Sequence, residues 1–115
     1  MVISRPTASI VGRFEHLVLL AVLYAGDDAY AVPIADEIER RTGARPSRGA
    51  LYTTLARLEE KGFLASMRGE PTPIRGGKAR RYYHVSAYGR RALRQARNDL
   101  VTVWPGLSRV LGDAR

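Results

Sequence analysis

The chain has no cysteine, only two histidines, and no apolar stretch long enough to cross a bilayer. Without cysteine, it can form no disulfide framework, thiolate zinc site or cysteine nucleophile. The apolar run Leu17–Ala25 is much shorter than the roughly 20 residues of a membrane-spanning helix. Residues 1–9 lack the basic and apolar regions of a secretory signal. We therefore expect a cytoplasmic protein with no membrane segment.

The chain also has few of the residue clusters that carry chemistry. His16 and His84 match no metal-ligand spacing, so we expect no metal site. The acid pairs 27–28 and 59–60 are explained by a turn and a helix surface, whereas acid–base catalysis needs carboxylates that converge in a cleft. Residues 76–78 lack the remainder of a phosphate-binding loop. The sequence predicts a protein that is not an enzyme and has no cofactor.

Positive charge is present in excess and is concentrated in one stretch. The formal net charge is +8 at pH 7. Residues 68–97 contain nine basic side chains and one acid, whereas the other 85 residues balance ten bases against ten acids. Charge gathered in this way indicates a polyanion contacted from one side, with nucleic acid as the leading candidate. The alternative for the four arginines between residues 90 and 97 is the solvated face of the last helix, on the side opposite its leucines.

A chain of 115 residues is expected to form one domain. Apolar spacing and stop signals predict helices at 13–25, 32–42 and 48–61, strands at 63–68 and 81–86, and a last helix from 87 into 103–111. Pro71 and Pro73 should keep the loop between the strands from pairing as strand. Trp104–Pro105 should kink or break the last helix. The predicted fold class is mainly α with a small β-hairpin.

The first predicted helix is apolar nearly all the way round. Its buried stripe is expected at helical spacing, and further leucines widen the apolar surface beyond that stripe. The expected stripe is Phe14, Leu17, Val18, Ala21 and Val22, widened by Leu19, Leu20 and Leu23. A helix of this kind must be covered on several sides. In so small a domain, we expect another subunit to cover one of them.

The helices predicted at 32–42 and 48–61 are joined by a short turn, which makes them a helix-turn-helix candidate. In such units the second helix enters the major groove of DNA with its N-terminal half leading. With Leu51, Leu55 and Leu58 facing the core, the outward face consists of Gly49, Thr53, Ala56 and Glu60. These mostly small residues would let the helix backbone approach DNA closely.

Cations and an aromatic ring flank that outward face. Arg48 and Tyr52 lie in the first turns, where they could reach a phosphate or a base edge, after Ser47 as the N-cap. Arg57 and Lys61 would follow the backbone strand on one side. The structural alternative is an amphipathic surface helix with Tyr52 half-buried.

The predicted hairpin supplies a second basic surface beside the same helix. Its cations are Arg75, Lys78, Arg80 and Arg81. A basic hairpin in this place can follow the phosphate backbone or enter the adjacent minor groove. The alternative is a solubilising edge on an exposed hairpin, and both can hold together.

At this point the residues resemble a known family. The segments Ser47–Tyr52 and Leu55–Leu64 resemble the core of PadR-type transcriptional regulators, which typically read Ser-Pro-Gly-x-Leu-Tyr and then Leu-x-Arg-Leu-Glu-x-x-Gly-Leu-Ile. The segments Gly76–Ser86 and Gly89–Leu93 resemble that family's wing strand and the residues after it. The resemblance covers about residues 13–95. Arg48 departs from the pattern because the family often has proline there.

The resemblance implies a winged helix-turn-helix homodimer, usually a repressor that a small ligand or stress signal releases from DNA. It implies a DNA-binding domain at 12–86 and a C-terminal dimerisation helix at 87–115. Residues 1–11 are expected to form a flexible arm, because Pro6 and small polar residues give them little to pack. The resemblance also implies DNA contacts from Ser47, Tyr52 and the wing bases. The operator would be a pseudo-palindrome in double-stranded DNA, with half-site centres about one helical turn apart.

By the same resemblance, the last helix pairs with the first helix and with the last helix of the other subunit. The expected dimer interface is Phe14, Leu17, Leu20, Leu93, Leu100, Val103 and Leu107. We expect Trp104 to pack in the core or the dimer interface. The alternative for Trp104 is an aromatic wall of an effector pocket between subunits.

Two other functions remain open at this stage. Winged helices are sometimes reused as protein-interaction adaptors, for which the small outward residues are suitable but the basic wing is unnecessary. An RNA-binding winged domain would need exposed aromatic rings that stack on bases. Tyr82 and Tyr83 are adjacent in a predicted strand, so only one of them can face outward for stacking.

Overall fold

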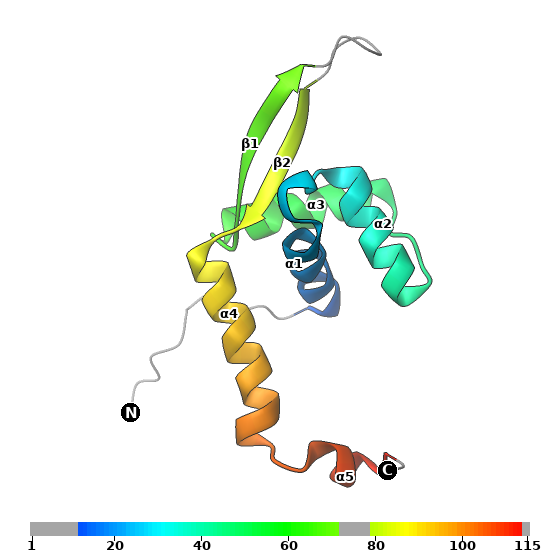
Figure 1. Ribbon diagram of the computed structural model, residues 1–115, viewed down its shortest axis with the longest axis vertical. Coiled ribbons are helices and arrows are strands. Elements are labelled where there is room, and N and C mark those ends of the chain that lie inside the picture. The colour runs from blue at the N-terminus through cyan, green and yellow to red at the C-terminus, as the bar shows by residue number, and fades with distance from the viewer. Residues whose placement is uncertain (1–11, 72–78, 114–115) are drawn as a thin grey trace.

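The computed structural model describes residues 12–71 and 79–113 (Figure 1). In chain order, its elements are α1 (Arg13–Ala25), η1 (Gly26–Asp28), α2 (Ala31–Thr42), α3 (Arg48–Glu60), β1 (Leu64–Pro71), β2 (Ala79–Val85), α4 (Ala87–Asn98), η3 (Asp99–Val103) and α5 (Leu107–Leu111). The two strands form one antiparallel hairpin. The predicted fold class, mainly α with a small β-hairpin, is confirmed, and the helix bounds differ from the predicted ones by one residue at most up to the end of α3.

α1 lies at the centre of the fold and packs against α2, α3 and β2. The core gathers apolar side chains from all of these elements: Val18, Leu19, Val22, Ile34, Ile38, Leu51, Leu55, Leu58, Phe63 and Tyr83. Leu19 is fully buried, whereas Phe14 and Leu17 are only half-buried, so the buried stripe of α1 differs from the predicted one. The reason is that a single protomer already covers α1 on three sides, including the side of Leu19.

Glycine and serine fix the turn between α2 and α3. Gly43 ends α2 in the left-handed conformation with φ 82°, where a residue without Cβ is favoured. The Ser47 hydroxyl accepts a hydrogen bond from the Ala50 N–H at 3.1 Å and so caps the start of α3. The predicted N-cap role of Ser47 is therefore confirmed, and α3 starts at Arg48 as the sequence indicated.

The hairpin is longer than predicted. β1 pairs with β2 from Leu64 opposite Val85 to Pro71 opposite Ala79, with a register shift between Arg68 and Pro71. The prediction that Pro71 stays out of the strand is wrong. β1 pairs only with β2 in the sheet, so its other edge can accommodate a residue without N–H, and proline is tolerated at such edges and irregularities. Pro73 lies outside the described residues.

α4 is anchored to the base of the hairpin by close contacts. The Ser86 hydroxyl caps α4 by accepting from the Gly89 N–H at 3.0 Å, and it donates to the carbonyl of Gly62 at 2.6 Å. The rings of Tyr88 and Phe63 stack with centroids 5.2 Å apart. Gly89 lies so close to Phe63 that a Cβ there would be 2.3 Å from the Phe63 carbonyl oxygen. The first turn of α4 and the start of β1 are thus packed as one unit.

Beyond this anchor, α4 and α5 extend away from the rest of the fold (Figure 1). α4 passes into the π-helical turn η3, and the helix then breaks at Trp104, which has φ −119° and ψ 67°. These angles confirm the predicted break at Trp104–Pro105. Its cause is that the residue before a proline is disfavoured in the α conformation. The π-helical turn before the break was not predicted.

Candidate nucleic-acid interface

α3 presents the outward face that its sequence predicts. Leu51, Leu55 and Leu58 are buried, and the exposed side consists of Gly49, Thr53, Ala56 and Glu60. A Cβ on Gly49 would meet nothing within 4 Å, so the first turn of α3 is open to the surroundings. The second helix of this helix-turn-helix is therefore sterically able to lie against a large partner with its N-terminal half first.

Arg48 and Tyr52 lie at the N-terminal end of that face. The Tyr52 side chain is 46% exposed, close to the half-buried alternative considered from the sequence. Arg48 and Tyr52 line a recess of about 260 Å³ together with Ala31 and Val32 of α2. Within residues 12–71 and 79–113, the side chains of Arg48 and Arg57 form no hydrogen bond or ion pair, so both guanidinium groups are free to meet an anion.

Other cations of the helix-turn-helix are engaged inside the protein. Arg45, in the turn, donates to Asp36 at 2.7 Å and to Glu39 at 2.9 Å, and these carboxylates raise the pKa of its guanidinium. Arg41 and Arg40 both pair with Glu37, and their hydrogen bonds lower the pKa of that carboxyl. These pairs brace α2 and the turn and add no net positive field.

Lys61 has a partner that the sequence analysis did not anticipate. Its ammonium group donates to both carboxylate oxygens of Glu15, at 3.0 and 3.2 Å. Glu15 is only 7% exposed, and a carboxylate in that environment needs a counter-charge. Contact between Lys61 and DNA phosphate stays a prediction, and it would have to compete with this ion pair between α1 and α3.

The hairpin face directed toward α3 carries paired arginines. Arg68 lies directly opposite Arg81 in the register, and like charges in such positions disfavour strand pairing. The Arg81 guanidinium donates to the Ser66 hydroxyl at 2.9 Å, and that hydroxyl donates to Glu59 of α3 at 2.8 Å. Arg81 is therefore fixed beside α3 through a chain of hydrogen bonds.

Arg80 points to the opposite face of the hairpin, as its neighbouring position in the strand requires. Its guanidinium carbon lies 4.3 Å from the centroid of the Tyr30 ring. Tyr30 in turn meets Tyr82 edge-on, with centroids 5.4 Å apart. The remaining predicted wing contacts, Arg75 and Lys78, lie outside the described residues.

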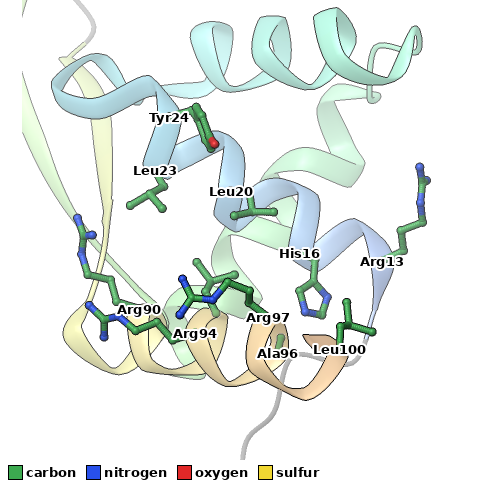
Figure 2. A pocket seen from close by; sticks show the side chains of 11 residues that line it. Arg13, His16, Leu20, Leu23, Tyr24, Arg90, Arg94, Ala96, Arg97 and Leu100 are labelled. Carbon is green, nitrogen blue, oxygen red and sulfur yellow. The ribbon is translucent and has the colours of Figure 1, made fainter. Parts of the chain in front are cut away.

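A groove with a volume of about 920 Å³ lies between α1 and α4. Figure 2 shows Leu20 and Leu23 of α1 facing α4 across it. The predicted interface residues Leu20, Leu93 and Leu100 line it, and Leu20 and Leu100 are 39% and 57% exposed. None of the residues that the structure describes covers this apolar surface.

The groove also contains arginines that were expected elsewhere. Arg90, Arg94 and Arg97 line it beside the leucines, whereas the sequence analysis placed them on the other side of α4. The prediction is wrong because Arg90 and Arg97 are three and four positions from Leu93, and such positions share one face of a helix. Arg94 has the same spacing from Arg90 and Arg97. Within the described residues, no acidic side chain lines this groove.

The other predicted interface residues lie at the edge of this surface or beyond it. Val103 is 59% exposed, and Leu107 is half-buried on α5. Trp104 is 63% exposed and does not line the groove. Packing of Trp104 in the core of one protomer is therefore excluded, whereas its place in a dimer interface or an effector pocket stays a prediction.

The described residues contain no group of three histidine or acidic side chains that could hold a metal ion. None of the helices in the described part of the chain is long and apolar enough to cross a membrane. His16 is half-buried on the groove side of α1, and its imidazole meets the Gly12 carbonyl at 3.2 Å. His84 is exposed on β2.

Two contacts near the candidate interface were not predicted from the sequence. Tyr30 contacts Arg80 although 50 positions separate them in the chain, and Glu15 pairs with Lys61 over a similar separation. A signal existed for Glu15, because an acid in an otherwise apolar helix requires a partner. No spacing rule pointed from Tyr30 to the hairpin.

Comparison with known proteins agrees with this architecture. Residues 19–95 match the model of the transcriptional regulator PadR-like family. A curated relative, the transcriptional regulator Rv3488 of Mycobacterium tuberculosis, is 37% identical over 76 residues. The match covers 66% of this chain and 66% of that protein's length.

Solved structures of similar proteins have the same fold. A PadR family transcriptional regulator from Eggerthella lenta is 28% identical, with a TM-score of 0.62 over 89% of this chain and 87% of that one. A PadR-like transcription factor from Bacteroides fragilis is 23% identical, with a TM-score of 0.66 over 86% of each chain. The likeness to the latter shows the fold alone. Together they confirm the predicted winged helix-turn-helix.

Proposed function

Because the chain belongs to the PadR-like family of transcriptional regulators, we propose that it binds double-stranded DNA in a sequence-specific manner as a homodimer. It acts as a repressor at a pseudo-palindromic operator in the cytoplasm, and a small molecule or stress signal releases it. A family of transcriptional regulators is not a class of enzymes. The arrangement of α3 and the hairpin supplies the DNA-binding part of this proposal.

One observation carries the DNA-binding role. α3 exposes a face of small residues whose N-terminal end bears the free guanidinium of Arg48 and the half-exposed ring of Tyr52. The hairpin beside it holds Arg81 against the same helix through Ser66 and Glu59. Small outward residues permit close approach to the major groove, and the arginines supply phosphate contacts. Arg68 and Arg81 face each other, a cost that an adjacent polyanion would relieve.

The homodimer is supported by apolar surface that residues 12–71 and 79–113 of one protomer leave exposed. Leucines of α1 and α4 line the groove between these helices. Further large apolar side chains are exposed on η3 and α5: Val101, Val103, Val110 and Leu111. Apolar surface of this extent is typical of an interface between proteins. Isologous pairing of two copies would cover it and would match a two-fold symmetric operator.

The groove between α1 and α4 is where we place the effector. The groove has the volume of a small-molecule site, and it lies on the surface that we assign to dimer contact. A ligand in the groove would therefore change how the two copies meet. Trp104 belongs to this site only if the partner subunit places it there, since it does not line the groove of its own protomer.

The RNA-binding alternative is disfavoured by the position of one ring. Tyr82 is the outward-facing member of the tyrosine pair, but it is half-buried against Tyr30. It therefore lacks the open face on which a base would stack. The adaptor alternative leaves Arg48, Arg57 and Arg68 without a role, because a protein partner does not require three exposed arginines around one helix.

The decisive experiment is selection of bound duplexes from a random pool, followed by footprinting of the selected site. We expect a pseudo-palindrome whose half-site centres are about one helical turn apart. The Arg48→Ala, Tyr52→Ala double variant should fold and lose the selectivity. Arg109→Ala, on α5, is the control because it also removes an arginine, at a place far from α3 (Figure 1). Undiminished binding by the double variant would contradict the assigned contacts.

A further inference from the structure

Arg80 differs from the other wing arginines in what holds it. Its guanidinium lies over the Tyr30 ring at 4.3 Å, in the geometry of a cation–π contact. Tyr82 meets the same ring edge-on at 5.4 Å with an interplanar angle of 65°. The Tyr82 hydroxyl also accepts a hydrogen bond from Arg80, which is the main cause of the raised pKa of this guanidinium. Two aromatic side chains therefore orient one exposed cation.

Both tyrosines are themselves fixed. Tyr30 immediately precedes α2, where its carbonyl accepts from the Ile34 N–H at 3.1 Å and its own N–H donates to Asp28 at 2.9 Å. The Tyr82 ring lies against Gly69, so closely that a Cβ on that glycine would be 2.7 Å from the ring. The platform under Arg80 is therefore part of the rigid frame, although Arg80 itself is exposed.

This arrangement leaves the positive charge of Arg80 available to an anion, although the Asp28 carboxylate also contributes to the raised pKa of the guanidinium. Within the described part of the chain, Arg80 forms no ion pair with a carboxylate, in contrast to Arg45, which is neutralised by two. A ring face and a hydroxyl restrict a guanidinium without cancelling its charge. Restricting it in advance lowers the side-chain entropy lost when an anion binds.

The platform also places Arg80 near the leading end of α3. Tyr30 adjoins Ala31 and Val32, and these two residues share a recess with Arg48 and Tyr52. The start of α2 thus connects the hairpin arginine with the residues that lead α3 into DNA. A duplex that contacts Arg48 would therefore also pass close to the start of α2, beside which Arg80 lies.

We propose that Tyr30 and Tyr82 are positioning residues that hold Arg80 ready for contact with a phosphate of duplex DNA. This inference rests on the proposed DNA-binding function. It separates Arg80 from Arg81, which hydrogen bonds tie to α3, and it gives Tyr30 a role through Arg80 instead of through direct contact with DNA.

The test is a double-mutant cycle between Tyr30 and Arg80. Affinity for a mixed-sequence duplex of about three helical turns is measured by fluorescence anisotropy at several salt concentrations. Tyr30→Leu should weaken binding about three- to fivefold when Arg80 is present, as loss of a cation–π contact implies. It should have no effect in the Arg80→Ala background. Arg80→Ala should reduce the slope of log affinity against log salt by about 0.9.

Tyr30→Phe is the matched control because it keeps the ring, and its affinity should equal that of the wild type. A merely structural role for Tyr30 would give the same loss in both backgrounds, and that result overturns the inference. An Arg80→Ala variant with unchanged affinity and salt slope also overturns it, while leaving DNA binding by the wild type intact. Failure of the wild type to bind any duplex at low salt instead refutes the proposed function.

A second variant protects the test against misfolding, which circular dichroism would detect. Arg80→Lys keeps the charge and leaves both tyrosines in place. Its compact ammonium group lacks the planar guanidinium that lies over the Tyr30 ring. We expect the same three- to fivefold loss for this variant, and wild-type affinity would overturn the inference.

Discussion

Gly89 and Gly49 are both helix residues, yet their surroundings are opposite. A Cβ on Gly89 would meet the Phe63 carbonyl oxygen at 2.3 Å and the Val85 side chain at 2.9 Å. A Cβ on Gly49 would meet nothing within 4 Å. Gly89 is therefore required by packing, whereas Gly49 leaves space at the surface where we place DNA.

Gly89→Ala should destabilise the protein by about 1–3 kcal/mol, because the backbone at Phe63 must shift to admit the methyl group. Chemical unfolding monitored by circular dichroism would measure this change. Gly49→Ala is the matched control and should raise stability by up to about 1 kcal/mol, since alanine favours the helix. The same variant should also weaken DNA binding, because its methyl group would occupy the space between α3 and the major groove of DNA. A Gly89→Ala variant as stable as the wild type would contradict the packing described.

At the level of elements, one ion pair joins α1 to α3. Glu15 belongs to α1, which lines the groove, and Lys61 follows the last turn of α3, the helix that we propose to contact DNA. The Glu15 side chain is 9% exposed and that of Lys61 is 27% exposed. The pair is therefore partly desolvated, and removal of one member has a different consequence from removal of both.

Lys61→Met should destabilise the protein by about 1–3 kcal/mol, because the Glu15 carboxylate is then buried without its partner. The Glu15→Leu, Lys61→Met double variant should recover most of this loss. Urea unfolding of the four proteins in the cycle measures both effects. Arg57→Met provides the comparison at an exposed position of α3 and should change stability by less than about 0.5 kcal/mol. Equal stability of the Lys61→Met variant and the wild type would show that the pair contributes nothing.

The elements were largely predictable because local signals define them. Ser47, Gly43 and Pro105 mark a helix start, a helix end and a break that the structure contains. Pro71 was misjudged because its effect depends on whether the strand lies at an edge, which only the sheet reveals.

Contacts of the candidate site were less predictable than its elements. The small outward face of α3 follows from helix periodicity alone. In contrast, the contacts of Tyr30 with Arg80 and of Glu15 with Lys61 join segments that are distant in sequence. Their formation depends on how α1, α2 and the hairpin pack. No periodic pattern within a single element contains that information.

At the scale of the whole molecule, the positive charge falls on two separate surfaces. Arg68 and Arg81 lie on the hairpin face directed toward α3, whereas Arg90, Arg94 and Arg97 line the groove between α1 and α4. The first surface would attract DNA. The second would bring like charges together if two copies pair across the groove, since no acid among the described residues lines it.

Added salt should therefore affect the two associations differently. DNA affinity should fall by orders of magnitude between about 50 and about 200 mM salt, because bound cations are released from the duplex. Dimer affinity should stay constant or rise, because salt screens repulsion between the groove arginines. Sedimentation of the free protein and anisotropy of the labelled duplex would measure the two separately. If added salt weakened the dimer as it weakens DNA binding, then attraction between opposite charges, not repulsion between the arginines, would dominate the dimer interface.

The anchor between α4 and the hairpin has a mechanical consequence. Ser86, Tyr88 and Gly89 fasten the first turn of α4 to the residues that begin β1. A rotation of α4 should therefore move the hairpin with it. In a dimer that pairs through α4, the angle at which the two α4 helices cross would set the distance between the two hairpins. A change of a few degrees in this angle would alter that distance, and with it the half-site spacing of the operators that the dimer can bind.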